Sequence, residues 1–154
     1  MTDIVKVAPP ITQVIVKSPD SVQVVTVAPT SINVTGGDKT TTTIYPAAIA
    51  VSALKLVRLD SNNKLVVADK DIDSTLLGLT TQSAIADAFP TVILSGLYSD
   101  SSWNWTRGSP LYLGTNGNIS DLVPLSGFIV PIGHAENTTI INLNISQGVQ
   151  ISVN

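Results

Sequence analysis

The chain has 154 residues, a net charge of −3 and no cysteine. The missing cysteines exclude disulfides, thiolate zinc sites and cysteine nucleophiles. The eight basic residues are scattered, which argues against nucleic-acid binding. No apolar run approaches the ~18 residues of a membrane span, and the N-terminus lacks a signal-peptide pattern. We therefore expect a protein made in the cytoplasm, with no nucleic-acid or membrane partner.

Hydrophobic residues make up 44% of the chain, whereas aromatic residues contribute 5% and charged residues 12%. The apolar residues are mainly Val, Ile, Leu and Ala, interleaved with Thr, Ser and Asn. This mixture favours β-strands, because β-branched side chains suit a pleated, half-buried surface. So few charges leave a surface poorly protected against association. The composition thus indicates a subunit of an assembly.

A ten-residue repeat occupies residues 4–35. Prolines separate Val- and Ile-rich runs at 11–16, 22–27 and 32–34, and proline belongs between strands or at sheet edges. A segment of this size is too small to form its own core. We expect residues 1–35 to be an extended β arm that orders against partners, most simply two further copies in a homotrimer. The expected assembly contacts are Ile11, Val14, Val16, Val22, Val24, Val27, Ile32 and Val34.

Residues 36–44 are predicted to be a linker, beginning at Gly36-Gly37. The four threonines at 40–43 fit an exposed strand equally well. From residue 45 onward, short apolar runs alternate with turn residues, and 83–89 is predicted to form one or two helical turns. The strands are expected at 54–59, 65–68, 76–80, 91–97, 110–113, 128–132, 140–145 and 149–153. This spacing predicts an all-β chain in which the arm precedes a small β-barrel or sandwich over residues 45–154.

Both tryptophans lie in the segment W-N-W-T-R-G-S-P-L-Y-L-G, residues 103–114. Asn116-Gly117 follows between apolar runs, and this dipeptide predicts a two-residue hairpin turn because both residues accept positive φ. Trp103 and Trp105 are candidate surface or barrel-end aromatics. We expect them to close one end of the barrel, with a platform for sugar stacking as the alternative.

Chemical motifs are weak. His134, the only histidine, has a neighbouring carboxylate at Glu136 but no nucleophile in a recognisable pattern. Asp69, Asp71 and Asp73 alternate as at the start of a calcium loop, but the loop's required Gly and Glu are missing downstream. We expect a solvated turn there. The sequence predicts no catalytic residue, no metal site and no cofactor, and therefore no enzyme.

The Trp-containing segment, the Asn116-Gly117 turn, Gly127-Phe128 and I-G-H-A at 132–135 together resemble small β-domains of tailed-bacteriophage virion proteins. The resemblance covers roughly residues 45–146. It implies a non-enzymatic virion protein, and we expect a capsid decoration or cement protein that binds the major capsid protein or another virion protein. Two alternatives stay open: a short tail fibre or adaptor that contacts the host, and a free carbohydrate-binding module that uses Tyr98, Trp103 and Trp105.

Overall fold

The computed structural model describes two parts of the chain. Residues 2–6, 13–17, 23–27 and 30–34 are described as backbone, and residues 40–152 with their side chains. Strands dominate these residues, and their one helical element is a 3₁₀ turn at Thr115–Gly117. No helix within them is long and apolar enough to cross a membrane. The predicted all-β fold class is confirmed.

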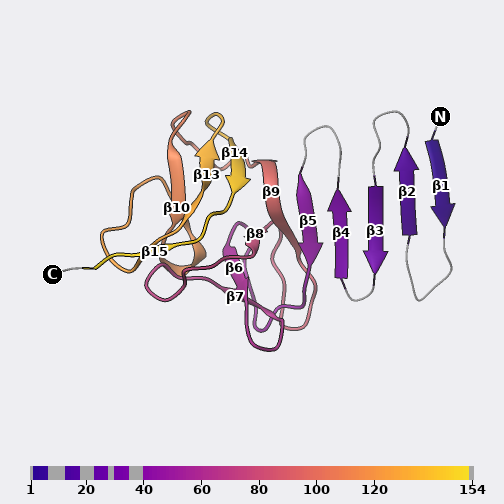
Figure 1. The fold of residues 1–154 in the computed structure, drawn as a ribbon, viewed down its shortest axis with the longest axis horizontal. Helices are drawn as coiled ribbons and strands as arrows, with labels where there is room; N and C mark the ends of the chain where they lie inside the picture. Colours follow the sequence, from indigo (N-terminus) through magenta and orange to yellow (C-terminus); the bar gives the residue numbers. More distant parts are fainter. Residues whose placement is uncertain (1, 7–12, 18–22, 28–29, 35–39, 153–154) are drawn as a thin grey trace.

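One antiparallel sheet contains most of the described strands (Figure 1). Its main path runs β1-β2-β3-β4-β5-β9-β14-β13-β10-β11. These strands are β1 (Thr2–Lys6), β2 (Gln13–Lys17), β3 (Gln23–Val27), β4 (Thr30–Val34), β5 (Thr41–Ile44), β9 (Thr91–Ser99), β10 (Pro110–Leu113), β11 (Ile119–Ser120), β13 (Pro131–Ala135) and β14 (Ile140–Asn144). A side branch joins through β9 and contains β6 (Leu56–Leu59), β7 (Leu65–Val67) and β8 (Gly78–Thr80). A separate pair consists of β12 (Phe128–Ile129) and β15 (Val149–Gln150).

The sheet curls into an antiparallel half-barrel, and two apolar clusters lie on opposite faces of β9. Ile93 belongs to the larger cluster, whereas its neighbour Val92 belongs to the smaller one. Consecutive residues of a strand point to opposite faces, so β9 is covered on both sides at this position. The larger cluster also contains Leu56, Ala68, Leu79, Leu111, Leu113, Val130, Ile132, Ala135, Ile141 and Leu143. The smaller cluster also contains Ala47, Val51, Val57 and Leu65.

Strands β1 to β4 extend this sheet away from the rest of the domain, in the order of the sequence (Figure 1). Their register runs without a shift into β5, and the β5–β9 ladder shifts once, between Thr41 and Thr42. One row of directly opposed residues consists of Val5, Val14, Val25, Ile32, Thr43 and Val92. Thr43 and Val92 are 3% and 0% exposed. The arm therefore continues a face of the sheet that is buried where it enters the domain.

Alternation along each strand assigns the arm residues to two faces. The face that contains this row, which we call the valine face, consists of Val5, Val14, Val16, Val25, Val27, Ile32 and Val34, with Asp3, Gln23 and Thr30. The opposite face, the lysine face, includes Lys6, Gln13, Lys17, Thr26, Ser31 and Asn33, with Ile4, Ile15 and Val24. Of the expected assembly contacts, Val24 belongs to the lysine face. Ile11 and Val22 lie outside the described residues, and the others share the valine face.

The linker prediction is wrong for the second half of residues 36–44. Thr41–Ile44 form β5, which pairs with β4 on one side and β9 on the other. The strand that was the alternative for residues 40–43 is therefore present, but it is not exposed, because Thr43 is buried. Its β-branched side chains suit a strand, and its partner β9 lies about fifty residues further along the chain. Residues 35–39 lie outside the described part.

The helical turns predicted at 83–89 are also absent. Ala84 forms an isolated antiparallel bridge to Val51, in which each amide donates to the other's carbonyl oxygen at 2.8 Å. These two bonds use the backbone groups that a helix would need. The segment therefore continues as bends and a turn against the smaller cluster.

The Asn116-Gly117 hairpin forms, with φ of 54° and 70° at its two turn residues. The amide of Asn118 donates to the carbonyl oxygen of Thr115 across the turn at 3.2 Å. The last residues paired in the ladder are those at 113 and 119, so the connection has five residues rather than the expected two. The positive φ values confirm the reason for the prediction, and the loop length corrects it.

Candidate binding surfaces

Trp103 and Trp105 lie between β9 and β10, and both indoles pack against the larger core cluster. The Trp103 ring meets Tyr98 edge-on, with centroids 5.9 Å apart, and its centroid is 6.1 Å from that of Trp105. The Trp105 amide donates to the carbonyl oxygen of Thr138 at 2.9 Å, and the Trp103 amide to that of Asp100 at 3.2 Å. The tryptophans thus pack against the core of the domain, as a structural role requires.

Polar groups fix the start of this segment. The hydroxyl of Ser102 donates to Oδ1 of Asp100 at 2.5 Å, and its amide donates to the same atom at 2.8 Å. These two bonds lower the pKa of the Asp100 carboxyl. Burial raises the pKa of Tyr98, and the negative charge of Asp100 raises it further. Charge and burial therefore favour a neutral tyrosine beside an ionised aspartate.

A shallow groove of about 520 Å³ lies beside the two indoles. Lys55 and Asn118 line it as well, and the Lys55 ammonium donates to Oδ1 of Asn118. Leu54, at its rim, has a φ of 59°, which is unusual for a leucine. Nε1 of Trp105 is buried without a hydrogen-bond partner among the described residues. Because this N–H is inaccessible, it cannot donate a hydrogen bond to a sugar in the groove, whereas an exposed indole could.

The acidic turn differs from the solvated turn that was expected, because Asp73 is only 9% exposed. Its Oδ1 lies 2.6 Å from Nε of Arg58, and its Oδ2 accepts the Asp69 amide at 2.9 Å. The Arg58 contact is close enough for an ion pair but lacks the alignment of a hydrogen bond. Asp69 in turn accepts the amides of Asp71 and Asn116 at 2.9 and 2.8 Å. The carboxylates therefore connect the turn to β6 and to the hairpin tip.

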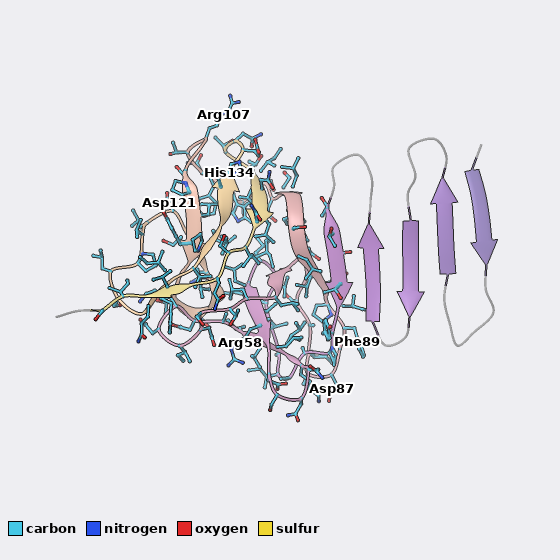
Figure 2. The ribbon with its side chains drawn as sticks, viewed as in Figure 1. Arg58, Asp87, Phe89, Arg107, Asp121 and His134 are labelled. Carbon is cyan, nitrogen blue, oxygen red and sulfur yellow. The ribbon has the colours of Figure 1, made fainter. Side chains whose placement is uncertain are left out.

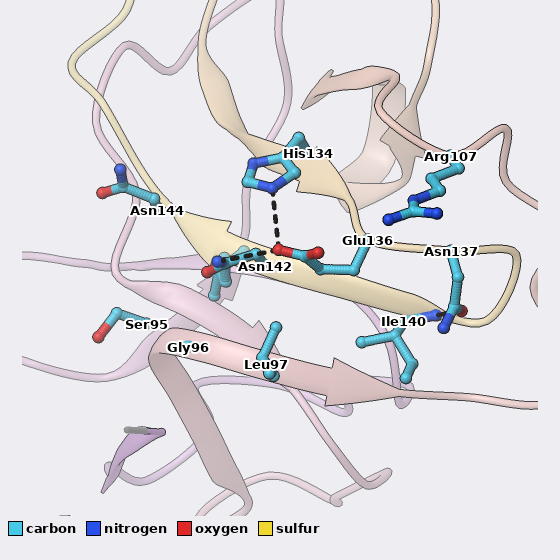
Figure 3. A pocket seen from close by; sticks show the side chains of 11 residues that line it. Ser95, Gly96, Leu97, Arg107, His134, Glu136, Asn137, Ile140, Asn142 and Asn144 are labelled. Carbon is cyan, nitrogen blue, oxygen red and sulfur yellow. Dashed lines mark hydrogen bonds and ion pairs between the residues drawn. The ribbon is translucent and has the colours of Figure 1, made fainter. Parts of the chain in front are cut away.

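A second, polar surface lies across β9, β14 and β13, on the face opposite the larger core cluster (Figure 3). Leu97 is directly opposite Asn142, which is directly opposite His134. Nε2 of His134 lies 3.1 Å from Oε1 of Glu136, and Nδ2 of Asn142 donates to the same oxygen at 3.4 Å. Together with Ser95 and Arg107 these side chains line a hollow of about 860 Å³. We call it the polar hollow.

His134 lies on strand β13, and Glu136 follows directly after the end of this strand, where the two side chains pair. No hydrogen bond joins the imidazole to Ser95, the hydroxyl residue in the hollow. A nucleophile, base and orienting group in mutual contact, as acyl transfer needs, are not found in the described part of the chain. Residues 40–152 also contain no group of three His, Asp or Glu side chains placed to hold a metal ion.

The sequence prediction missed the polar hollow, although one signal pointed to it. In β14 the buried Ile141 and Leu143 alternate with Asn142 and Asn144, as expected for a strand with one open face. That two neighbouring strands add His134 and Ser95 to the same face depends on the sheet order, which no local pattern specifies. Comparison with known protein families and with curated protein sequences finds no match to this chain.

Proposed function

We propose that the protein is a non-enzymatic structural component of a bacteriophage particle, a capsid decoration protein that associates as a trimer through its arm. The virion setting is supported by the resemblance of residues 45–146 to tailed-phage β-domains. The observation that carries the proposal is the valine face. It continues a buried face of the domain, but no second layer from the described chain covers it in the arm (Figure 1).

An uncovered face of this composition favours association. Burial of a Val or Ile side chain contributes ~1.5–3 kcal/mol, so covering the seven of the valine face contributes about 10–20 kcal/mol per chain. The lysine face contains Lys6 and Lys17, which keep it compatible with water. The two faces therefore differ enough to orient the arm in an assembly, with the valine face inward.

Identical copies of the chain supply identical valine faces. Three flat meanders can close into a triangular prism whose inner side is formed by three such faces, and closed symmetry prevents runaway growth. The sole acidic residue of the described face, Asp3, lies on β1 at the far edge of the sheet. The prism interior is then mainly apolar, with Gln23 and Thr30 as the other polar residues of the valine face. The domains project from the prism toward the particle surface.

Light scattering on the full-length protein tests the trimer. The expected mass is three times 16.1 kDa, or about 48 kDa. Val16→Glu and Lys17→Glu are a matched pair, since they are neighbours in β2 on opposite faces. Val16→Glu should give a monomer with a folded domain, and Lys17→Glu should remain trimeric. A wild-type monomer or dimer, or dissociation by Lys17→Glu alone, would contradict the proposed arrangement.

Cryo-electron microscopy of particles from the phage that encodes the chain tests the location. Density for the domain on the capsid surface, lost when residues 1–35 are deleted, is the expected result. Density confined to the tail would favour the fibre or adaptor function and overturn decoration. Particles without the protein would overturn the virion proposal as a whole.

A further inference from the structure

The polar hollow lies on the same sheet face as the valine face, but its chemistry differs. Ser95 is directly opposite Thr41, which is directly opposite Val34 of the arm. From Ser95 of β9 onward, this face carries the polar residues Asn142, Asn144 and His134 besides the apolar Leu97 and Ile140. Covering such groups with an apolar strand would leave them without partners, at a cost of ~1–3 kcal/mol each. The hollow therefore suits a polar occupant rather than another arm.

Glu136 organises the hollow. Its Oε1 is bonded to Nε2 of His134 and Nδ2 of Asn142 (Figure 3), and these two bonds restrict the carboxylate. Within residues 40–152, Oε2 of Glu136 and the guanidinium of Arg107 make no hydrogen bond. The side-chain amide of Asn144 also makes no hydrogen bond to these residues. A carboxylate held by two bonds, with donors and acceptors that lack partners around the same open space, is what a polar ligand needs.

The backbone shapes the hollow. Gly96 lines it with a φ of 108°, and Gly133, which precedes His134 in β13, has a φ of 134°. A Cβ atom on Gly133 would come within 1.9 Å of the Asn142 carbonyl oxygen. Both neighbouring ladders shift register, in β5–β9 and in β10–β13, and such bulges redirect side chains. The open space is thus built into the strands rather than left by a loop.

The ligand class follows from charge and shape. Arg107 and Glu136 bring opposite charges, and Arg107 is the single Lys or Arg that lines the hollow, so the hollow lacks the cluster of basic side chains that a phosphate or sulfate requires. Side-chain amides, a carboxylate and a guanidinium are planar groups with paired donors or acceptors, which match neighbouring hydroxyls. Leu97, 38% exposed, adds an apolar contact for the C–H face of a sugar ring. We propose that the polar hollow binds a neutral oligosaccharide.

Titration of the full-length, ¹⁵N-labelled protein with maltohexaose, cellohexaose, isomaltohexaose and triacetylchitotriose tests the proposal by NMR. At least one sugar should shift the amides of β9, β13 and β14 at millimolar concentration. Glu136→Gln and Arg107→Ala should each weaken that binding at least tenfold. Asp87→Asn is the matched control: Asp87 is exposed at the opposite end of the domain (Figure 2), so binding should be unchanged.

Inorganic phosphate and a hexa-alanine peptide serve as competing probes. Shifts in the hollow with either probe but with none of the sugars would overturn the proposal, as would the absence of sugar-induced shifts. Equal loss in Asp87→Asn would mean that the site is elsewhere. The Val16→Glu variant separates sugar binding from trimer formation. If this variant is a monomer and still binds the sugar, the hollow binds without the trimer.

Discussion

Truncation of the two tryptophans should destabilise the domain unequally. A buried Trp removes ~150–250 Å² from water, and ~200 Å² at ~25 cal/mol per Å² corresponds to about 5 kcal/mol. Both indoles are only partly buried, so we expect about 3 kcal/mol for Trp103→Ala. This variant also loses ring contacts with Tyr98 and Trp105. A loss of that size corresponds to a decrease in Tm of about 12 °C for a domain of this length.

Trp105→Ala should cost less, about 2 kcal/mol, because it loses one ring contact and also removes a buried N–H without a partner. Such an orphan donor costs ~1–3 kcal/mol in the folded state. Trp105→Phe should therefore be close to neutral, whereas Trp103→Phe should not. Urea denaturation followed by circular dichroism measures all four variants without relying on tryptophan fluorescence. Unshifted transitions for both alanine variants, with loss of glycan binding, would refute the structural role and restore the sugar-platform alternative.

Three further predictions concern glycine packing, the buried ion pair and pH. Gly133→Ala should cost more than about 3 kcal/mol or prevent folding, because its Cβ would lie 1.9 Å from a carbonyl oxygen. Gly108 has open space around it and a φ of 83°, so Gly108→Ala should cost about 1 kcal/mol. Thermal melts compare the two variants. Asp73→Asn should cost about 2 kcal/mol in urea denaturation by weakening the contact with Arg58, a value between exposed and buried pairs; an unchanged midpoint would contradict it. Burial raises the pKa of Tyr98 above 10.0, so the unfolded chain loses this proton first and stability falls as pH rises above ~10; Tm measured from pH ~9 to ~11 should fall less steeply in Tyr98→Phe.

The elements that sequence predicted best are those specified by neighbouring residues. The turn at Asn116-Gly117 depends on two residues that tolerate positive φ, and the hairpin of β6 and β7 depends on a polar loop between apolar runs. In that loop the Asp60 carboxylate accepts the amides of Asn62 and Lys64. Both features are complete within about a dozen residues, so local chemistry determines them.

The features that were missed depend on contacts between distant segments. For residues 40–43 the sequence left a linker and an exposed strand equally open, because the pairing with β9 is not visible locally. Asp73 was expected to be solvated because Arg58 lies on another strand. The polar hollow requires the order β9-β14-β13, in which chain neighbours are not always sheet neighbours. Alternation can indicate that one face of a strand is open, but the residues that meet on that face are decided by topology.

The arm strands follow one another in sequence order across the sheet, so the width of the arm is set by the number of repeats. Each ten-residue repeat adds one strand at the outer edge, and strands lie ~4.8 Å apart, so the four strands before β5 reach about 19 Å from it. Duplication or deletion of one repeat would change this reach by one strand spacing without changing the strand order of the domain. It would also reverse the direction of the outermost strand, so that only changes by two repeats keep the N-terminus at the same end. The arm is therefore a spacer that evolution can lengthen or shorten in discrete increments.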